Sequence, residues 1–232
     1  MSTAFGRPEE VEGPVRGYNA AVMNLVPTLL ALAFSAAPSP SAPVTLVGAG
    51  ALGPGGAAWL TEVGYPQLSV SYAQGLDEWN DLGGTVALAW TTGEMVLGLV
   101  WRRELAGDAG SRAGFRLTAG PWFNFGGTWI YAENQPNLGL LAAPGVAWTA
   151  SAGGGLFSAT LDLGLEWALQ RDMGFGFVPR LGVAYEAPVS KDVTLGARAG
   201  LWVRWATGSA RIPGLDDKLL GELAAVVTWK VF

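Results

Sequence analysis

The 232-residue sequence predicts an all-β protein, an antiparallel up-and-down transmembrane β-barrel that follows an N-terminal signal-like helix. First, apolar residues recur at every second position, which is the period of a β-strand. Second, these alternating runs are roughly 10 to 15 residues long, and a tilted strand that crosses a bilayer needs ~9–11 residues. Third, half of the residues are hydrophobic, only 14% are charged and 34 are glycine. This composition is typical of a crowded interior inside a lipid-facing wall.

Residues 1–42 are expected to form an N-terminal extension with a signal peptide, and residues 43–232 a single barrel domain. The apolar stretch 25–37 is shorter than the ~20 residues of a membrane-spanning helix. Its length matches the hydrophobic region of a signal peptide, and small residues and prolines follow it. Met23 is an alternative start of translation, and a short buried core helix is the alternative interpretation of this stretch.

Nine alternating runs predict strands of the barrel wall. The clearest is 156–169, where the odd-numbered residues from Phe157 to Leu169 are apolar and the even-numbered ones are polar or small. A strand places these two sets on opposite faces. The other runs are 63–74, 82–91, 95–105, 113–125, 138–150, 173–187, 192–206 and 218–231.

A tenth, weaker strand is expected at 44–53. An even strand number places both termini on one side of a bacterial barrel, which favours ten strands. Ten strands also place the connections 54–62, 126–137 and 206–217 on the opposite, extracellular side. Eight strands are the alternative, with 44–53 as a plug or linker and one run misread.

Seven tryptophans lie within a few residues of predicted strand ends. An amphipathic indole ring prefers the headgroup level of a bilayer, so these side chains predict an interfacial aromatic girdle. The alternative is a set of aromatic residues at the rim of a soluble β-sandwich. The seven are Trp90, Trp101, Trp122, Trp148, Trp167, Trp205 and Trp229.

Charged residues on the polar faces of the strands predict a charge network in the lumen. Both signs are present, which indicates salt bridges that fill the interior, and 8–10 strands leave little room for a wide pore. With a tight turn near Arg171, Asp162 and Arg180 are expected to face each other on adjacent strands. The network comprises Asp162, Glu166, Arg180, Glu186, Arg198, Arg204, Lys218 and Glu222, and Arg116 is a further candidate.

The composition also excludes several functions. The sequence has no histidine and no cysteine, so it lacks the commonest general base and the thiolate metal ligands. Its net charge of −5 argues against nucleic-acid binding. Glycine-rich segments lack the lysine of a phosphate loop, and Ser190-Lys191 is expected to form a turn. We therefore expect no enzyme activity and no catalytic, cofactor-binding or metal-binding residues.

The signal-like segment, the alternating strands and the terminal Phe232 together resemble small outer-membrane β-barrel proteins of Gram-negative bacteria. The resemblance implies that Phe232 is a C-terminal signal for the barrel-assembly machinery, although Lys230 and Thr228 stand where apolar residues are usual. It implies export to the outer membrane and a monomer in contact with the bilayer and lipopolysaccharide. The known hydrolases of this architecture depend on histidine. We expect a structural, adhesion or surface-interaction role; the alternatives are a narrow channel for small solutes and a soluble secreted β-protein.

Overall fold

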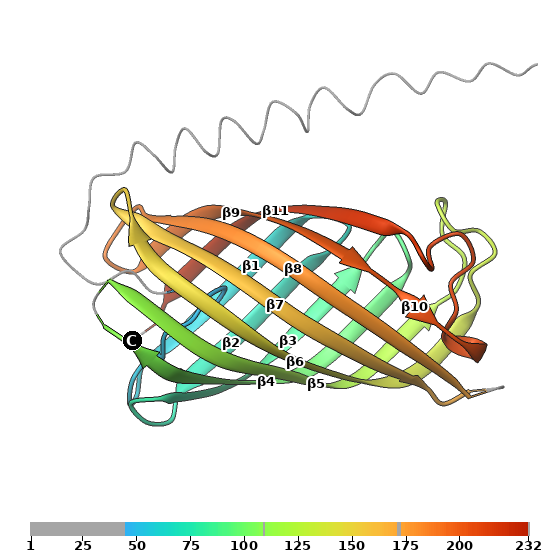
Figure 1. Ribbon diagram of the computed structural model, residues 1–232, viewed down its shortest axis with the longest axis horizontal. Helices are drawn as coiled ribbons and strands as arrows, with labels where there is room; N and C mark the ends of the chain where they lie inside the picture. The colour runs from blue at the N-terminus through green and yellow to red at the C-terminus, as the bar shows by residue number, and fades with distance from the viewer. Residues whose placement is uncertain (1–44, 109, 171–172, 232) are drawn as a thin grey trace, which may run out of the picture.

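The computed structural model describes residues 45–108, 110–170 and 173–231 (Figure 1). The predicted signal segment 25–37, the boundary after residue 42 and Phe232 lie outside these ranges. Most described residues belong to antiparallel strands. These are β1 (Ala57–Tyr65), β2 (Leu68–Gly75), β3 (Asn80–Ala89), β4 (Glu94–Gly107), β5 (Ser111–Phe125), β6 (Pro136–Ala152), β7 (Gly155–Ala168), β8 (Gly174–Pro188), β9 (Val193–Val203), β10 (Trp205–Ala206) and β11 (Leu219–Lys230).

The sheet closes on itself. Strand β1 pairs with both β2 and β11, while β9 pairs with both β8 and β11. The short β10 also pairs with β8, and only Arg204 separates it from β9, so the two form one interrupted wall strand. The described residues therefore form a closed antiparallel barrel of ten strands. The predicted fold class and the favoured strand number are confirmed.

The tenth strand lies elsewhere than predicted. Residues 45–53 form no strand, and the run 63–74 contains parts of two strands, β1 and β2, joined by a turn at Pro66 and Gln67. The expected connection 54–62 is accordingly wrong, because β1 begins at Ala57. In β1 the outward apolar residues have odd numbers (Val63, Tyr65), and after this two-residue turn those of β2 have even numbers. The alternation alone did not reveal this change, so the two strands were predicted as one.

The connections define two different ends of the barrel. At the end where β1 begins and β11 finishes, the turns are short: 76–79, 108–110, 153–154 and 189–192. We call this the short-turn end. The opposite, long-loop end carries the connections 126–135 and 207–218 beside the shorter 66–67, 90–93 and 169–173. The two ends lie at the left and right of Figure 1. The predicted placement of the two longest connections on one side is correct.

Side chains alternate between the outer surface and the lumen as the period of two predicts. In β7, Leu161, Leu163 and Trp167 remain 41%, 40% and 41% exposed, whereas Ser158 and Thr160 are buried inside. A soluble β-sandwich would bury its large apolar side chains between the sheets. Here they face outward. No helix among the described residues is long and apolar enough to cross a membrane.

Candidate functional site

Aromatic side chains form a belt around each end of the outer surface. The short-turn belt contains the ring pairs Trp59–Tyr72, Trp59–Trp229, Trp101–Phe115 and Trp148–Phe157, with centroids 5.0, 6.4, 5.6 and 6.2 Å apart. The long-loop belt contains Tyr65–Trp90, Trp90–Trp129, Trp167–Phe175 and Phe177–Trp205, at 5.7, 6.5, 5.9 and 5.8 Å. Exposed aliphatic side chains lie between the belts, such as Val86, Leu99 and Leu181. This surface matches a bilayer core flanked by two headgroup regions.

Six of the seven predicted girdle tryptophans lie in these belts, but Trp122 does not. Its side chain is only 3% exposed and packs inside the barrel with Ala168 and Ala210. Trp122 occupies an even-numbered, inward position of β5. The indole ring fits there because its partner on the neighbouring strand is Gly139. A Cβ atom at that position would overlap the ring.

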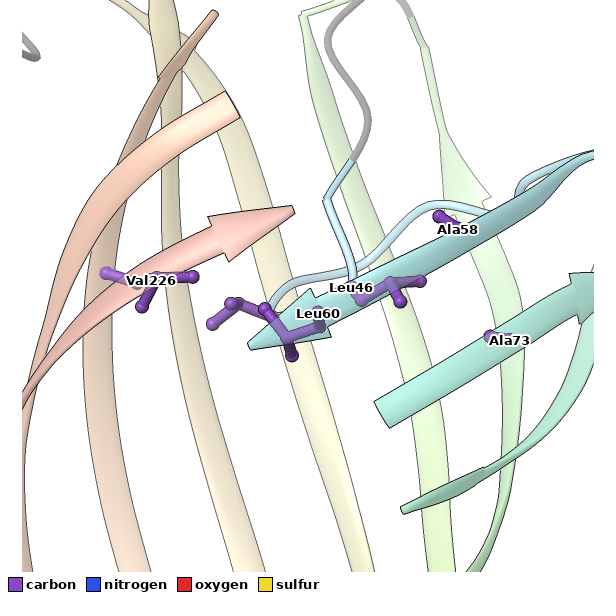
Figure 2. Packing of buried hydrophobic residues seen from close by; sticks show 7 residues of the cluster. Leu46, Ala58, Leu60, Ala73 and Val226 are labelled. Carbon is purple, nitrogen blue, oxygen red and sulfur yellow. The ribbon is translucent and has the colours of Figure 1, made fainter. Parts of the chain in front are cut away.

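Residues 45–53 enter the lumen at the short-turn end and act as a plug. Leu46 and Val47 are buried against small and aliphatic residues of the inner wall (Figure 2). These wall residues are Ala58, Leu60, Ala73, Ala184 and Val226. The plug thus completes an apolar cluster inside a lumen that is otherwise rich in charge.

Polar side chains of the wall form hydrogen bonds with the backbone carbonyl and amide groups of the plug. Arg102 Nη2 donates to the carbonyls of Thr45, Gly48 and Gly50 at 3.2, 3.0 and 2.8 Å. Arg116 donates to the carbonyl of Val47 at 3.1 Å. In return, the amides of Ala49, Ala51 and Leu52 donate to Thr149, Glu104 and Asp81 at 2.7, 2.9 and 2.9 Å. Buried backbone groups outside a ladder need such partners, so these contacts hold the plug in place.

Glu186 anchors the beginning of the plug. Its carboxylate is fully buried and accepts hydrogen bonds from the hydroxyls of Thr45, Thr194 and Thr228, the last two at 3.2 and 2.8 Å. Among the described residues, no arginine or lysine lies within ion-pair distance of Glu186. Three hydroxyl donors therefore stabilise this carboxyl group at the point where β8, β9, β11 and the plug meet.

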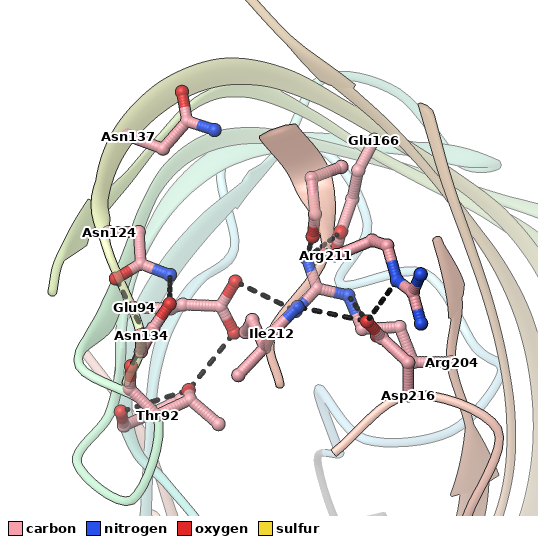
Figure 3. Close-up of polar contacts among 12 residues, drawn as sticks. Thr92, Glu94, Asn124, Asn134, Asn137, Glu166, Arg204, Arg211, Ile212 and Asp216 are labelled. Atoms are coloured by element: carbon pink, nitrogen blue, oxygen red, sulfur yellow. Dashed lines mark hydrogen bonds and ion pairs between the residues drawn. The ribbon is translucent and has the colours of Figure 1, made fainter. Parts of the chain in front are cut away.

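Arg204 organises the long-loop end. Its guanidinium lies 3.3 Å from Glu94, 2.7 Å from Glu166 and 3.8 Å from Asp216, and it donates to the carbonyl of Ala210 at 2.9 Å (Figure 3). Glu94 and Glu166 belong to β4 and β7, while Asp216 and Ala210 belong to the loop 207–218. One arginine therefore ties two wall strands to the loop.

The loop 207–218 folds into the mouth of the barrel. Ile212 and Leu215 are buried against Val178 and Trp202 of the inner wall. The amide of Ile212 donates to Asp216 at 2.9 Å. Burial raises the pKa of Asp216, and the nearby Arg204 guanidinium opposes this rise. Side chains of the chain itself thus occupy the long-loop mouth, as the plug occupies the opposite one.

A cavity of about 210 Å³ lies inside the lumen. Two ion-pair groups of its wall involve Arg116 and Arg198. Arg116 contacts both oxygens of Asp162 at 2.6 and 2.5 Å. Arg198 lies 3.0 Å from Glu62 and 3.2 Å from Glu222. Arg180 also lines the cavity, with its guanidinium 5.4 Å from the ring centroid of Trp202.

The structure places seven of the eight predicted network residues inside the barrel. Lys218 is the exception: it is exposed, lies in the loop one residue before β11, and donates to the carbonyl of Gly214. Asp162 and Arg180 are directly opposite each other on β7 and β8, as predicted. However, the ion pair of Asp162 is with Arg116, two strands away on β5.

Sequence reasoning missed further charged residues of the lumen, among them Glu62, Asp81, Glu94, Arg102, Glu104 and Asp216. All but Asp216 lie at inward positions of their strands. The alternation could have identified Arg102 and Glu104, which belong to the predicted strand 95–105, whereas Glu62, Asp81 and Glu94 lie outside the predicted runs. Asp216 lies in a loop, where no period indicates which side chains turn inward. Among the described residues, no group of three or more His, Cys, Asp or Glu side chains is placed to hold a metal ion.

The fold and its outer surface define the class of the protein, a small transmembrane β-barrel with an occupied lumen. No family model and no curated protein matches the sequence. Among solved structures, it is similar to CarO2 of Acinetobacter baumannii, with 10% identity, a TM-score of 0.27, and coverage of 76% of this chain and 98% of that one. It is also similar to CarO of the same organism (12%, 0.26, 78% and 99%) and to a loop L8 deletion mutant of OmpT, an outer-membrane protein of Vibrio cholerae (9%, 0.26, 76% and 97%). TM-scores this low establish no shared fold, so the class stands on the strand pairings and the surface of this chain.

Proposed function

We propose that the chain is a non-enzymatic barrel of the bacterial outer membrane, with a structural or surface-interaction role and a lumen closed by its own segments. One observation carries the proposal: the plug 45–53 occupies one mouth and the loop 207–218 occupies the other. Both are held by apolar packing and by buried arginines. A barrel stabilised in this way can serve as a rigid structural protein of the membrane, with the loops of its long-loop end available for contacts at the cell surface.

The membrane location is supported by the exposed aliphatic zone between two aromatic belts. The segment 25–37 supplies the proposed export signal, and Phe232 the proposed signal for the barrel-assembly machinery. We further propose that the folded barrel is a monomer in contact with the bilayer and lipopolysaccharide. The absence of histidine from all 232 residues supports a role outside hydrolysis.

Planar-bilayer recording on the purified full chain tests the closed lumen. We expect no single-channel steps, because chain segments fill both mouths. Heat-modifiable gel migration and dependence on detergent test the membrane location, and a chain that stays monodisperse without detergent would contradict it.

A narrow channel for small solutes is the second candidate. The luminal cavity of about 210 Å³ next to the plug favours it, because charged and hydroxyl side chains line part of its wall. Discrete conductance steps from the unmodified chain would favour this function over a closed barrel.

A further inference from the structure

The arginines of the cavity wall differ in how their guanidinium groups are satisfied. Arg102 lies 3.3 Å from Asp81 and donates to plug carbonyls. Arg116 binds both oxygens of Asp162, and Arg198 contacts two glutamates. Arg180 is the exception among the residues that the structure describes. It has no carboxylate within 4.0 Å, and its hydrogen bond is a long one of 3.4 Å to Gln67 Oε1.

The register explains why Arg180 lacks a carboxylate. Its neighbour on β7 is Asp162, but both oxygens of Asp162 accept from Arg116. Its neighbour on β9 is Trp202, whose ring lies beneath the guanidinium. An arginine carries five N–H donors, and a planar guanidinium matches the two oxygens of a carboxylate. Among the described residues, one hydrogen bond to Gln67 is therefore the main polar contact of the Arg180 guanidinium.

The cavity determines the size and charge of a molecule that could use these donors. Its volume of about 210 Å³ is below the ~300–1,000 Å³ of sites for drug-sized ligands, so the ligand has few heavy atoms. Ser69, Ser71 and Thr118 also line the cavity, and the hydroxyls of Ser69 and Ser71 donate to Glu62 and Thr85 at 2.8 Å, so Arg180 is the main donor for a ligand. Nearby, Glu94 and Glu166 share Arg204 with Asp216, so carboxylates outnumber the arginine there. A ligand with one negative charge would therefore pair with Arg180, whereas a second negative charge would have no further unpaired arginine among the described lining residues.

We propose that Arg180 binds the carboxylate of a small monocarboxylic acid within the lumen. The guanidinium contacts the two oxygens of the ligand, and Trp202 holds the guanidinium plane in position. The site is independent of conduction, because binding in the cavity requires no continuous passage through both mouths.

Saturation-transfer difference NMR tests the site on the purified full chain in detergent micelles and carboxylate-free buffer. The probe is acetate, whose methyl protons receive saturation when it is bound. We expect transfer to acetate from the unmodified barrel and an affinity about 10- to 100-fold lower in Arg180→Gln, the range for a charged hydrogen-bonding pair. Arg112→Gln is the matched control, since Arg112 lies in the barrel wall, pairs with Glu104 and does not line the cavity.

The remaining outcomes also decide the proposal. Arg180→Lys, which keeps the charge and loses the fork of donors, is expected to bind acetate at an intermediate affinity. Inorganic phosphate is expected to compete poorly, and competition equal to that of acetate would overturn the monocarboxylate assignment. Equal transfer in Arg180→Gln and the unmodified barrel, or none in the unmodified barrel, would overturn the site. Heat-modifiable migration of each variant shows that it is folded, so loss of binding reports on the site.

Discussion

Replacement of Arg204 by methionine removes the cation that three carboxylates share at the long-loop end. The guanidinium side chain is 2% exposed, and its partners Glu94, Glu166 and Asp216 are all largely buried. Methionine retains most of the aliphatic volume, so the substitution chiefly removes charge and hydrogen bonds. The carboxylates would then face one another without compensation.

The expected cost follows from the geometry of these contacts. Removal of one partner of a buried ion pair costs ~3–5 kcal/mol, because the remaining charge stays buried. Only the contacts to Glu166 and to the carbonyl of Ala210 have hydrogen-bond geometry, which favours the lower end of this range. We expect the free energy of unfolding to fall by about 3 kcal/mol, or roughly 100-fold in the unfolding equilibrium constant.

Arg211→Met is the matched control, because Arg211 belongs to the same loop and lies 3.9 Å from Asp216. Its side chain is 63% exposed, so water screens the pair and the expected loss is below about 1 kcal/mol. Urea unfolding in detergent micelles, followed by tryptophan fluorescence, measures both variants. Limited proteolysis of the loop 207–218 reports whether it leaves the mouth. If both variants lost the same unfolding free energy and the loop were equally protected from proteolysis, the proposed role of Arg204 in holding the loop to the wall would be refuted.

Three further predictions concern the plug, the outer wall and a turn. Gly48→Ala places a methyl group against the hydroxyls of Thr149 and Ser158, so we expect the plug to be displaced and proteolysis within 45–53 to accelerate; unchanged protection would contradict the tight fit. Leu161→Arg, at the middle of β7, is expected to lower the unfolding free energy in lipid vesicles by ~2–4 kcal/mol, whereas Val189→Arg in a turn serves as the near-neutral control. Backbone hydrogen bonds lower the pKa of Asp77, so its stabilisation of the turn 76–79 is present above pH 3.8 and is lost as pH falls through the lower folded-state pKa. Hydrogen exchange of this turn, corrected for intrinsic rates, should accelerate only in that acid range, and Asp77→Asn should remove the dependence.

The wall of the barrel was predictable because the period of two is a local property of the chain. In β7 the alternation from Phe157 to Trp167 identified both the strand and its outward face. The alternation of inward and outward positions along each strand also predicted many of the charged residues that face the lumen, including Glu186 and Arg198. The same rule was available for Arg102 in the predicted strand 95–105, but not for Glu62, because its strand had been assigned to the connection 54–62.

The errors arose where local sequence permits two structures. Residues 44–53 are as apolar as a strand, and the choice of a plug depends on Arg102 and Arg116, which lie more than fifty residues away. Trp122 lies near a strand end like the belt tryptophans, yet its even position in β5 and the gap at Gly139 bring it inside. Lys218 precedes the strand by one residue, so its side chain lies outside the alternation.

By itself, the sequence indicated a β-barrel with an apolar exterior and a charged lumen, since strand period and composition are carried by neighbouring residues. It favoured ten strands but placed the tenth at 44–53, and only the strand pairings located it at β1. Tertiary structure decided which charges meet, because contacts across a lumen join strands that are distant in the chain. Asp162 shows the difference: the pairing of β7 with β8 places it opposite Arg180, but Gly145 of β6, which has no side chain, lies between Asp162 and Arg116 and lets Arg116 reach both of its oxygens. That choice leaves Arg180 without a carboxylate among the described residues, and it sets the chemistry of the cavity.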